Sequence, residues 1–418
     1  MRTLLAFPAP TDFSVHVALA FQERGLLAGF STTFAYHEES ILAAFVGRLP
    51  ASIGRKLHTE LERRGVSLIE HRLVETRPGW EIVRTLAVKS GASAVLVDRL
   101  WDWAMKDFTS SVAKRISRGD VDLLYAYEYT ALEAFEVAKA SNIPRVLDFP
   151  SLNSRQFEVL QKQQKRDFPE LVAPDEAYFE GRFEQRQERR DREASMADMI
   201  VTNSTVSRDS HIANGADPDK TFFVNYGAPT PLSEVVPHRA DRPLRVLWAG
   251  SFNLRKAAHH FVSAWRSLPA GAATADVYGA IKLPDRLLKP SLRGVTFHGS
   301  VVRSELFSAY EKADVLVFPT LSDGFGMVVT EAFSRGLPVI TTASAGASDL
   351  VLNGRNGLII EADNPDAIVA ALEWCLANRV QLSLMRQDAL ETARRWQWAD
   401  YRNKLFELVS GYIQDKAV

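Results

Sequence analysis

The chain has 418 residues, more than a single hydrophobic core normally supports, so two domains are expected. Its 50 Lys and Arg residues nearly balance 51 Asp and Glu residues, so the overall charge gives no support for nucleic acid as a partner. The apolar run at the start is too short for a secretory signal, and no stretch approaches the length of a membrane span, which predicts a cytoplasmic protein. A disulfide within the chain is excluded because Cys375 is the only cysteine, and its apolar helical surroundings predict a core position.

Strand-like and helix-like segments alternate along the chain in two successive sets, which predicts an α/β protein with two parallel sheets and crossover helices. The first set opens with a strand at 3–7 and a helix through 16–24, and it later includes a strand within 122–129. A strand, a capped helix and a strand end this set at residue 227. Residues 228–243 are rich in proline and polar residues, have no clear period and predict a linker, after which the second set begins at Leu244.

Two helical segments of the first set carry charge patterns that need an explanation. Residues 101–118 combine Trp101 and Phe108 with Lys and Arg, and we expect this helix to pack its apolar stripe on the domain core. A peripheral contact with a membrane surface is the alternative. Residues 183–193 alternate in sign, which favours a solvated helix face over contact with nucleic acid.

The second set starts with a strand that ends near Trp248, a turn at Gly250 and a helix with Arg255 and Lys256 near its start. Cations at a helix start oppose the macrodipole, so this pair favours a role such as holding a diphosphate. A solvated basic pair on a surface helix is the alternative.

Residues 314–342 predict a strand, a glycine-bearing loop, a short helix and a second strand. In an open parallel sheet, ligands bind beyond the carboxyl ends of the strands, so the loop at 320–326 should face a crevice. A helix that starts near Gly326 would point its free amides into this crevice, and Gly324 and Gly326 remove side chains that would keep a phosphate away from the backbone. The segment therefore predicts a diphosphate site.

Asp323 in this loop and Glu331 in the helix are separated by seven residues and can contact different parts of one extended ligand. This segment resembles the retaining glycosyltransferases of family 4, also called glycosyl transferases group 1, which carry two acidic residues with seven between them. Asp323 stands where those proteins usually have Glu, and Glu331 matches in full. The resemblance covers nearly all of residues 244–400 and is weaker in the first half, where its clearest part ends at 229.

The resemblance implies the GT-B fold, with two Rossmann-like parallel-sheet domains that face a central cleft. It implies an acceptor-side domain at 1–227, the linker at 228–243, a domain that binds the nucleotide sugar at 244–395, and a helix at 396–418 that crosses back to the first domain. It also implies that Glu331 holds the ribose, Asp323 meets the donor sugar and Lys256 clamps the phosphates. The donor-binding set that it implies is Gly250, Ser251, Arg255, Lys256, Gly324, Phe325, Gly326, Met327, Val328, Val329 and Glu331.

Several positions depart from the family pattern. Ser251 stands where an Arg is usual, and Arg255 is the candidate to replace that Arg; Ala257 follows Lys256 where Gly is usual. On the acceptor side the candidates are His16, Tyr127 and Glu128, and Tyr127 occupies a position at which relatives often have His. For His16, an ordinary polar residue on the first helix is the favoured interpretation.

Other enzyme classes receive less support from the sequence. Two carboxylates also serve retaining glycosidases, but a phosphate cradle has no use in the hydrolysis of a neutral glycoside. Neither opening strand is followed by G-x-G-x-x-G, and a P-loop is absent from the sequence, which disfavours dehydrogenases and kinases. The loop segment lacks an Asp-x-Asp cluster, so we expect neither a metal nor a cofactor besides the nucleoside diphosphate sugar.

The resemblance thus predicts a metal-independent, retaining glycosyltransferase that moves a hexose-type unit to an acceptor hydroxyl of a glycan, a lipid-linked sugar or a small molecule. The alternative is a nucleotide-sugar-binding protein of the same fold that has lost transfer, which Ser251 and Tyr127 motivate. A lipid-linked acceptor would bring the protein to the inner face of the membrane as a peripheral partner.

Overall fold

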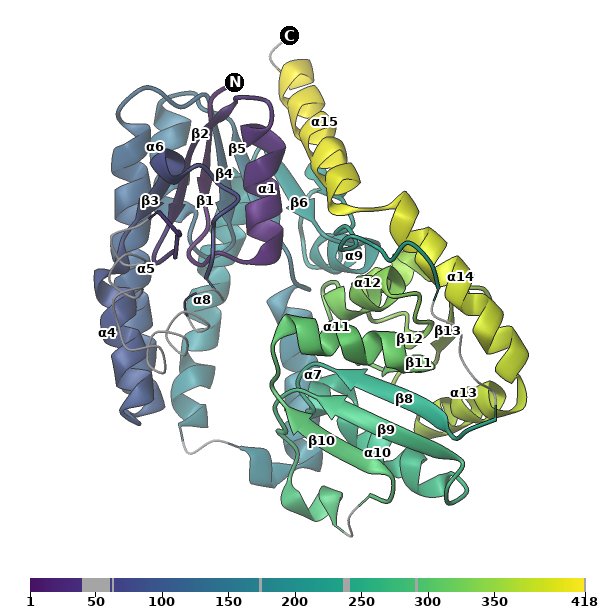
Figure 1. Ribbon diagram of the computed structural model, residues 1–418. Coiled ribbons are helices and arrows are strands. Elements are labelled where there is room, and N and C mark those ends of the chain that lie inside the picture. The colour runs from purple at the N-terminus through teal and green to yellow at the C-terminus, as the bar shows by residue number, and fades with distance from the viewer. Residues whose placement is uncertain (40–60, 62–63, 173–174, 236–240, 290–291, 417–418) are drawn as a thin grey trace.

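The computed structural model describes residues 1–39, 61, 64–172, 175–235, 241–289 and 292–416. These residues fold into two parallel sheets, one above the other in Figure 1, and helices cover each sheet. The prediction of an α/β chain with two successive parallel sheets is confirmed.

In the described part of the chain, the first sheet has seven strands in the order β3-β2-β1-β4-β5-β6-β7. Its strands are β1 (Thr3–Ala6), β2 (Leu27–Thr32), β3 (Val74–Thr76), β4 (Leu123–Tyr127), β5 (Arg145–Phe149), β6 (Met199–Thr202) and β7 (Thr221–Phe223). Its helices are α1 (Asp12–Gln22), α4 (Pro78–Lys89), α5 (Ala94–Ile116), α6 (Leu132–Ala140), α7 (Ser154–Asp167), α8 (Glu176–Met196) and α9 (Thr205–Ile212), with short 3₁₀ turns at His71–Leu73, Pro169–Leu171 and Pro218–Lys220.

The second sheet has six strands in the order β10-β9-β8-β11-β12-β13. Its strands are β8 (Leu244–Ala249), β9 (Ala273–Tyr278), β10 (Val295–Gly299), β11 (Val315–Phe318), β12 (Val339–Thr342) and β13 (Gly357–Ile360). Its helices are α10 (Ala258–Ser267), α11 (Arg303–Lys312), α12 (Met327–Ser334), α13 (Pro365–Ala377) and α14 (Arg379–Arg395), with 3₁₀ turns at Leu254–Lys256, Asp285–Leu288 and Gly346–Leu350.

Alternation along the strands explains why helices cover both faces of each sheet, because successive strand residues point to opposite sides. In β1, Leu4 belongs to the buried cluster that contains Phe108 of α5, whereas Leu5 belongs to the cluster that contains Phe21 of α1. Both residues are fully buried. The expected packing of the 101–118 helix on the core is therefore confirmed, and Cys375 is buried in the second domain as predicted.

The chain passes between the domains a second time at its end. The helix α15 (Trp398–Lys416) packs on α1, where Phe406 contacts Phe21 and Arg402 pairs with Glu23 (Figure 1). The two crossings touch at Gly227, where an added Cβ would lie 2.3 Å from the backbone nitrogen of Trp398. Only glycine fits this close approach.

None of the helices in the described ranges combines the length with the apolar character that spanning a bilayer requires.

Candidate functional site

The segment predicted to bind a diphosphate forms the expected elements. Strand β11 ends at Phe318, the loop 319–326 follows, and α12 begins after Gly326, which has a left-handed φ of 90°. No side chain among the described residues caps this helix start. The first amides of a helix have no partner within the helix, so the start of α12 offers donors and positive potential to an anion.

Lys256 and Asp323 form a direct ion pair beside this helix start. The side chain of Lys256 is only 8% exposed, and its ammonium lies 4.7 Å from the centre of the Phe318 ring. An added Cβ on Gly326 would meet the same ring at 2.7 Å, so Lys256 and Gly326 lie on one aromatic side chain. The predicted neighbourhood of Lys256 and the start of α12 is present.

Two effects act on the charge of Lys256 in opposite directions. Burial, with a smaller contribution from Arg255, lowers the pKa of Lys256 to about 6. The carboxylate of Asp323 in direct contact favours the ammonium form, and we take the intact pair as ammonium and carboxylate because the contact is immediate. The charge of Lys256 therefore depends on Asp323.

Arg255 and the turn at Gly250 have more structural contacts than the sequence suggested. Arg255 donates to the carbonyl of Ser322 at 2.8 Å and lies 5.9 Å from the ring of Phe157 in the first domain. Burial lowers the pKa of its guanidinium. Gly250 is left-handed with φ 105°, and the half-buried Ser251 follows it. The Arg255 side chain therefore supports the 319–326 loop through the Ser322 carbonyl.

Glu331 lies within α12 and is held by two groups of α11. The hydroxyl of Tyr310 donates to Oε2 at 3.0 Å, and Nη2 of Arg303 lies 3.7 Å from Oε1. Burial raises the pKa of Glu331, while Arg303 and Tyr310 oppose this rise. A carboxylate accepts at about four lone-pair positions, so acceptor capacity remains for further hydroxyl donors.

Gly324 and Phe325 contact the first domain. An added Cβ on Gly324 would lie 2.4 Å from the carbonyl oxygen of Pro150, and the Gly324 carbonyl accepts from Ser204 at 2.7 Å. The ring of Phe325 is buried at 5.1 Å from that of Tyr226. The sequence interpretation gave Gly324 only the task of admitting a phosphate, but the glycine also allows the loop to touch the first domain.

The acceptor-side candidates Tyr127 and Glu128 lie at the end of β4, where Tyr127 is the last strand residue and Glu128 follows it. Glu128 accepts from Ser151 at 2.8 Å and from Nε of Arg190 at 3.0 Å, and it is nearly buried. Because Ser151 adjoins Pro150, which faces Gly324, Glu128 is one hydrogen bond from the segment that touches the 319–326 loop. Burial raises the pKa of Tyr127, so its hydroxyl stays protonated.

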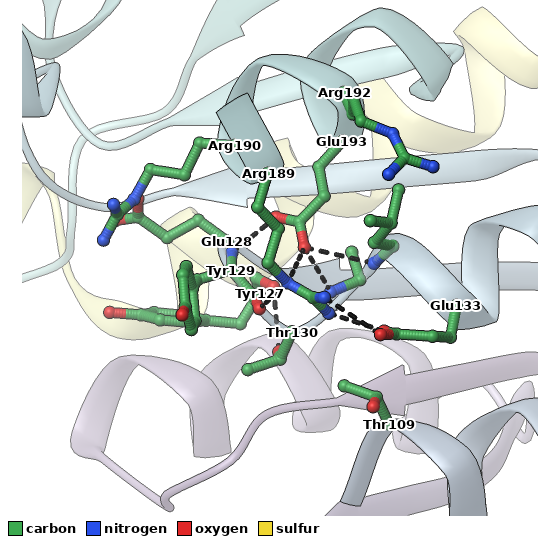
Figure 2. Close-up of polar contacts among 12 residues, drawn as sticks. Thr109, Tyr127, Glu128, Tyr129, Thr130, Glu133, Arg189, Arg190, Arg192 and Glu193 are labelled. Carbon is green, nitrogen blue, oxygen red and sulfur yellow. Dashed lines mark hydrogen bonds and ion pairs between the residues drawn. The ribbon is translucent and has the colours of Figure 1, made fainter. Parts of the chain in front are cut away.

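The charged face of α8 is not solvated throughout, which corrects the expectation for residues 183–193. Glu193 is fully buried and accepts from the amides of Ala131 and Leu132 at 3.0 and 3.1 Å, and from that of Tyr129 (Figure 2). It thereby caps the start of α6 from another helix. Tyr129 has φ 67°, an unusual conformation for a residue with a side chain, and it follows Glu128 directly. Alternating charges signalled a helix but did not signal which carboxylate was buried.

His16, the third acceptor-side candidate, lies apart from the contacts of Glu128. Its ring stacks on Trp398 at 4.1 Å, and Nδ1 lies 3.2 Å from Nη1 of Arg402. Burial lowers the pKa of His16 to about 4, so the ring is neutral and Nδ1 accepts from the guanidinium. His16 lines an interdomain cavity of about 550 Å³ together with Asp12 and Arg303.

One group of side chains among the described residues could hold a metal ion. His259, His260 and Asp363 place ligand atoms within 4.8 Å of one another, in the second domain. His260 lies 2.7 Å from Asp363, whose side chain is 75% exposed, and this hydrogen bond accounts for the arrangement without an ion. None of the three belongs to the predicted site.

Sequence patterns did not identify the partners of the candidate residues. Tyr310 and Arg303 hold Glu331, while Arg190 and Ser151 hold Glu128. These partners come from elements that only the folded chain brings together. Arg303 lies at the start of α11, where a cation opposes the helix macrodipole. This unfavourable position is the sequence signal that could have identified Arg303 as a functional candidate.

Comparison with known proteins supports the family in the second half of the chain. Residues 243–378 match the family model described as glycosyl transferases group 1. The D-inositol 3-phosphate glycosyltransferase of Corynebacterium urealyticum is 34% identical over 116 residues, which cover 28% of this chain and 27% of that protein. The matched segment is thus about a quarter of the length of this curated relative.

Solved structures resemble the chain over nearly its whole length. Sucrose-phosphate synthase from Thermosynechococcus elongatus has a TM-score of 0.64 at 16% identity and covers 99% of each chain. HepE of Anabaena, solved with UDP and glucose, has a TM-score of 0.62 at 16% identity and covers 98% of this chain and 100% of its own. These likenesses show the two-domain GT-B fold.

Proposed function

We propose that this GT-B chain, which carries a glycosyl transferases group 1 domain, transfers a sugar from a nucleoside diphosphate sugar to an acceptor hydroxyl. The observation that carries the proposal is the arrangement around α12. Its uncapped start lies beside the buried Lys256–Asp323 pair, and Glu331 lies one turn inside the helix. The helix start with Lys256 suits a diphosphate, Asp323 suits a sugar, and Glu331 suits a ribose of the same donor molecule.

The charge that develops on the leaving diphosphate requires fixed positive groups nearby. In the proposal, the amides of Met327 and Val328 and the ammonium of Lys256 supply this stabilisation, whereas the amide of Val329 already donates to the Gly326 carbonyl at 2.9 Å. A buried ammonium acts through a lower effective dielectric than an exposed one, so its contribution is larger. No metal ion is required in this scheme.

Asp323 and Glu331 receive separate roles in the proposal. Glu331 accepts from the ribose hydroxyls with the oxygen positions that Tyr310 and Arg303 leave available. Asp323 accepts from the donor sugar hydroxyls while it keeps Lys256 charged. Neither carboxylate attacks the sugar; the acceptor approaches from the leaving-group side, so the configuration is retained.

The first domain supplies the acceptor site in this proposal. Glu128 is held by Ser151 and Arg190 close to the segment that touches the 319–326 loop, which suits a group that orients an acceptor hydroxyl. A sugar, a lipid-linked sugar or a small molecule would each offer such a hydroxyl.

A second candidate function is binding of the nucleotide sugar without transfer. Ser251 and Tyr127 favour it, because an arginine and a histidine are expected at these positions from the family resemblance. Arg255 gives only partial compensation, since one of its nitrogens is already bound to Ser322.

The test is release of nucleotide from a panel of UDP, GDP and ADP sugars without acceptor, with and without a chelator. We expect slow release from one member of the panel that the chelator leaves unchanged. Release that the chelator abolishes would contradict metal independence. Binding without release, measured by calorimetry on the same panel, would favour the second candidate.

Glu331→Gln tests the ribose contact. The amide replaces an acceptor by a donor in a buried site, so nucleotide affinity should fall by about 10-fold or more. Pyrophosphate affinity should stay unchanged because the diphosphate site is intact. Unaltered nucleotide affinity would contradict this role of Glu331.

A further inference from the structure

Arg303 connects the two domains through two carboxylates. Its Nη1 lies 2.7 Å from Oδ2 of Asp12 at the start of α1, and its Nη2 lies 3.7 Å from Oε1 of Glu331 in α12. The first carboxylate belongs to the first domain and the second to the second domain. The Arg303 guanidinium therefore contacts a surface carboxylate of the first domain and a nearly buried carboxylate of the second.

The two ends of this bridge differ in exposure. Asp12 and Arg303 are about half exposed, at 48% and 49%, whereas the side chain of Glu331 is 13% exposed. Solvent screens a half-exposed ion pair, so the Asp12 contact biases the domains only modestly. The effect on a nearly buried carboxylate is larger because solvent screens it less.

Arg303 favours the ionised form of Glu331, which burial disfavours. The groups that act on it are Arg303 and Tyr310 of α11 and Asp12 of α1: the first two favour the carboxylate, and the like charge of Asp12 opposes it. His16, Arg335 and Arg402 line the interdomain cavity that Asp12 and Arg303 also line. His16 is neutral above about pH 4, Arg335 is paired with Glu311, and Arg402 is paired with Glu23. Arg303 is thus the cation that faces Glu331 among the groups named.

We propose that Arg303 is a positioning residue that links nucleotide binding at Glu331 to the apposition of the two domains through Asp12. The inference rests on the proposed ribose contact of Glu331. When the domains meet, Asp12 fixes the guanidinium on one side, and the guanidinium then holds Glu331 ionised and oriented for the ribose hydroxyls. By reciprocity, a bound nucleotide favours the arrangement in which Arg303 and Asp12 are paired.

The experiment compares Arg303→Met, Asp12→Asn and the double variant in the full-length chain. The readout is affinity for the nucleotide that binds in the panel, measured by calorimetry from pH 5 to pH 8, with pyrophosphate as second probe. Arg286→Met is the matched control, because Arg286 also pairs across the domains, with Glu170 at 2.6 Å, and is similarly exposed. Arg303→Lys keeps the charge and tests whether the forked geometry is needed.

We expect Arg303→Met to weaken nucleotide binding by about 10-fold and Asp12→Asn by about 2- to 5-fold, the latter matching loss of a half-exposed pair. The double variant should be no weaker than Arg303→Met, because both changes break one chain of contacts. As the pH is lowered, the nucleotide affinity of Arg303→Met should also begin to fall at a higher pH than that of the wild type, since the cation that opposes protonation of Glu331 is gone. Pyrophosphate affinity and the Arg286→Met control should match the wild type.

Tighter nucleotide binding by Arg303→Met would overturn the inference, because Arg303 would then compete with the ribose for Glu331. An effect of Asp12→Asn that adds fully to that of Arg303→Met would overturn the link between the domains. If Glu331→Gln weakens nucleotide binding while Arg303→Met does not, the inference fails and the proposed function stands. If Glu331→Gln has no effect, the proposed ribose contact itself fails.

Discussion

At the scale of single residues, the ion pair of Lys256 and Asp323 joins two roles that the sequence kept separate. The resemblance implies that Lys256 binds the phosphates and Asp323 the donor sugar, yet the two side chains are in contact. Because burial lowers the pKa of Lys256 to about 6, loss of Asp323 would leave a lysine that is neutral at pH 8. The carboxylate of Asp323 therefore controls the protonation of Lys256.

Asp323→Asn should therefore reduce transfer far more than nucleotide affinity at pH 5.5, where Lys256 keeps its proton without a partner. At pH 8 the variant should also lose nucleotide and pyrophosphate affinity, by about 10-fold, because the neutral amine no longer attracts phosphate. Calorimetry at both pH values measures the affinities, and acceptor-free release measures turnover. An affinity that does not change with pH would contradict the dependence of Lys256 on Asp323.

The sequence located the candidate residues better than their surroundings. Asp323, Glu331, Gly326 and Lys256 could be chosen because the loop, its glycines and the resemblance mark them, and the fold places Lys256 beside the start of α12. The burial of Glu193 could not be predicted, since its three amide partners lie about 60 residues away in the chain.

At the scale of elements, the first domain carries one buried carboxyl group on a strand and another on a helix. Asp148 at the end of β5 accepts from the hydroxyl of Tyr125 at 2.8 Å, and burial raises its pKa to about 7. Burial raises the pKa of Glu193 to about 7 as well. A carboxyl group whose pKa is higher in the folded state destabilises the fold as pH rises from its unfolded pKa to its folded pKa.

Asp148→Asn tests this effect on stability. In the wild type, Asp148 alone should lower the free energy of unfolding by about 1.4 kcal/mol for each pH unit between about 4 and 7. The asparagine variant lacks this loss, so it should be more stable than the wild type at pH 8 by a few kcal/mol and similar to it near pH 4. Urea unfolding across this pH range measures the difference.

Asp122→Asn is the control for this prediction. The hydrogen bond from Arg2 lowers the pKa of Asp122 to about 2. Because Asp122 is near the surface, its substitution should lower the free energy of unfolding by less than about 1 kcal/mol above pH 4. Equal stability of the wild type and Asp148→Asn at pH 8 would contradict a raised pKa of Asp148 in the folded state.

The elements themselves were largely predictable. Strand β11 and helix α12 lie where the apolar run and the helical period placed them, because Pro319 and Gly336 interrupt those patterns. The contacts of α7 could not be predicted, since its position beside Arg255 depends on how the two sheets meet.

At the scale of the whole molecule, the domains meet where the 319–326 loop touches the end of β5. Gly324 allows this contact, since any side chain there would meet Pro150 at 2.4 Å and Ser151 at 2.8 Å. The hydroxyls of Ser204 and Ser207 bind the carbonyl of the same glycine, at 2.7 and 3.1 Å. The donor and acceptor sites of the proposal are therefore brought together by a backbone contact.

Gly324→Ala should separate the domains without unfolding either of them. The clash is with backbone atoms, which cannot rotate away, so the loop and the end of β5 must move apart. We expect acceptor transfer to fall by about 100-fold, because a misplacement of about 1 Å has that cost, and nucleotide affinity to fall less than transfer does. In the presence of nucleotide, small-angle scattering should give a larger radius of gyration for Gly324→Ala than for the wild type.

Gly181→Ala is the matched control for this variant, since Gly181 lies in α8 and an added Cβ there meets no atom within 4 Å. It should retain wild-type transfer and scattering, and helix propensity predicts a slight gain in stability. If Gly324→Ala retained full transfer, the close approach of the loop to Pro150 would not be required for catalysis. The acceptor would then have to reach the donor from a more open arrangement of the two domains.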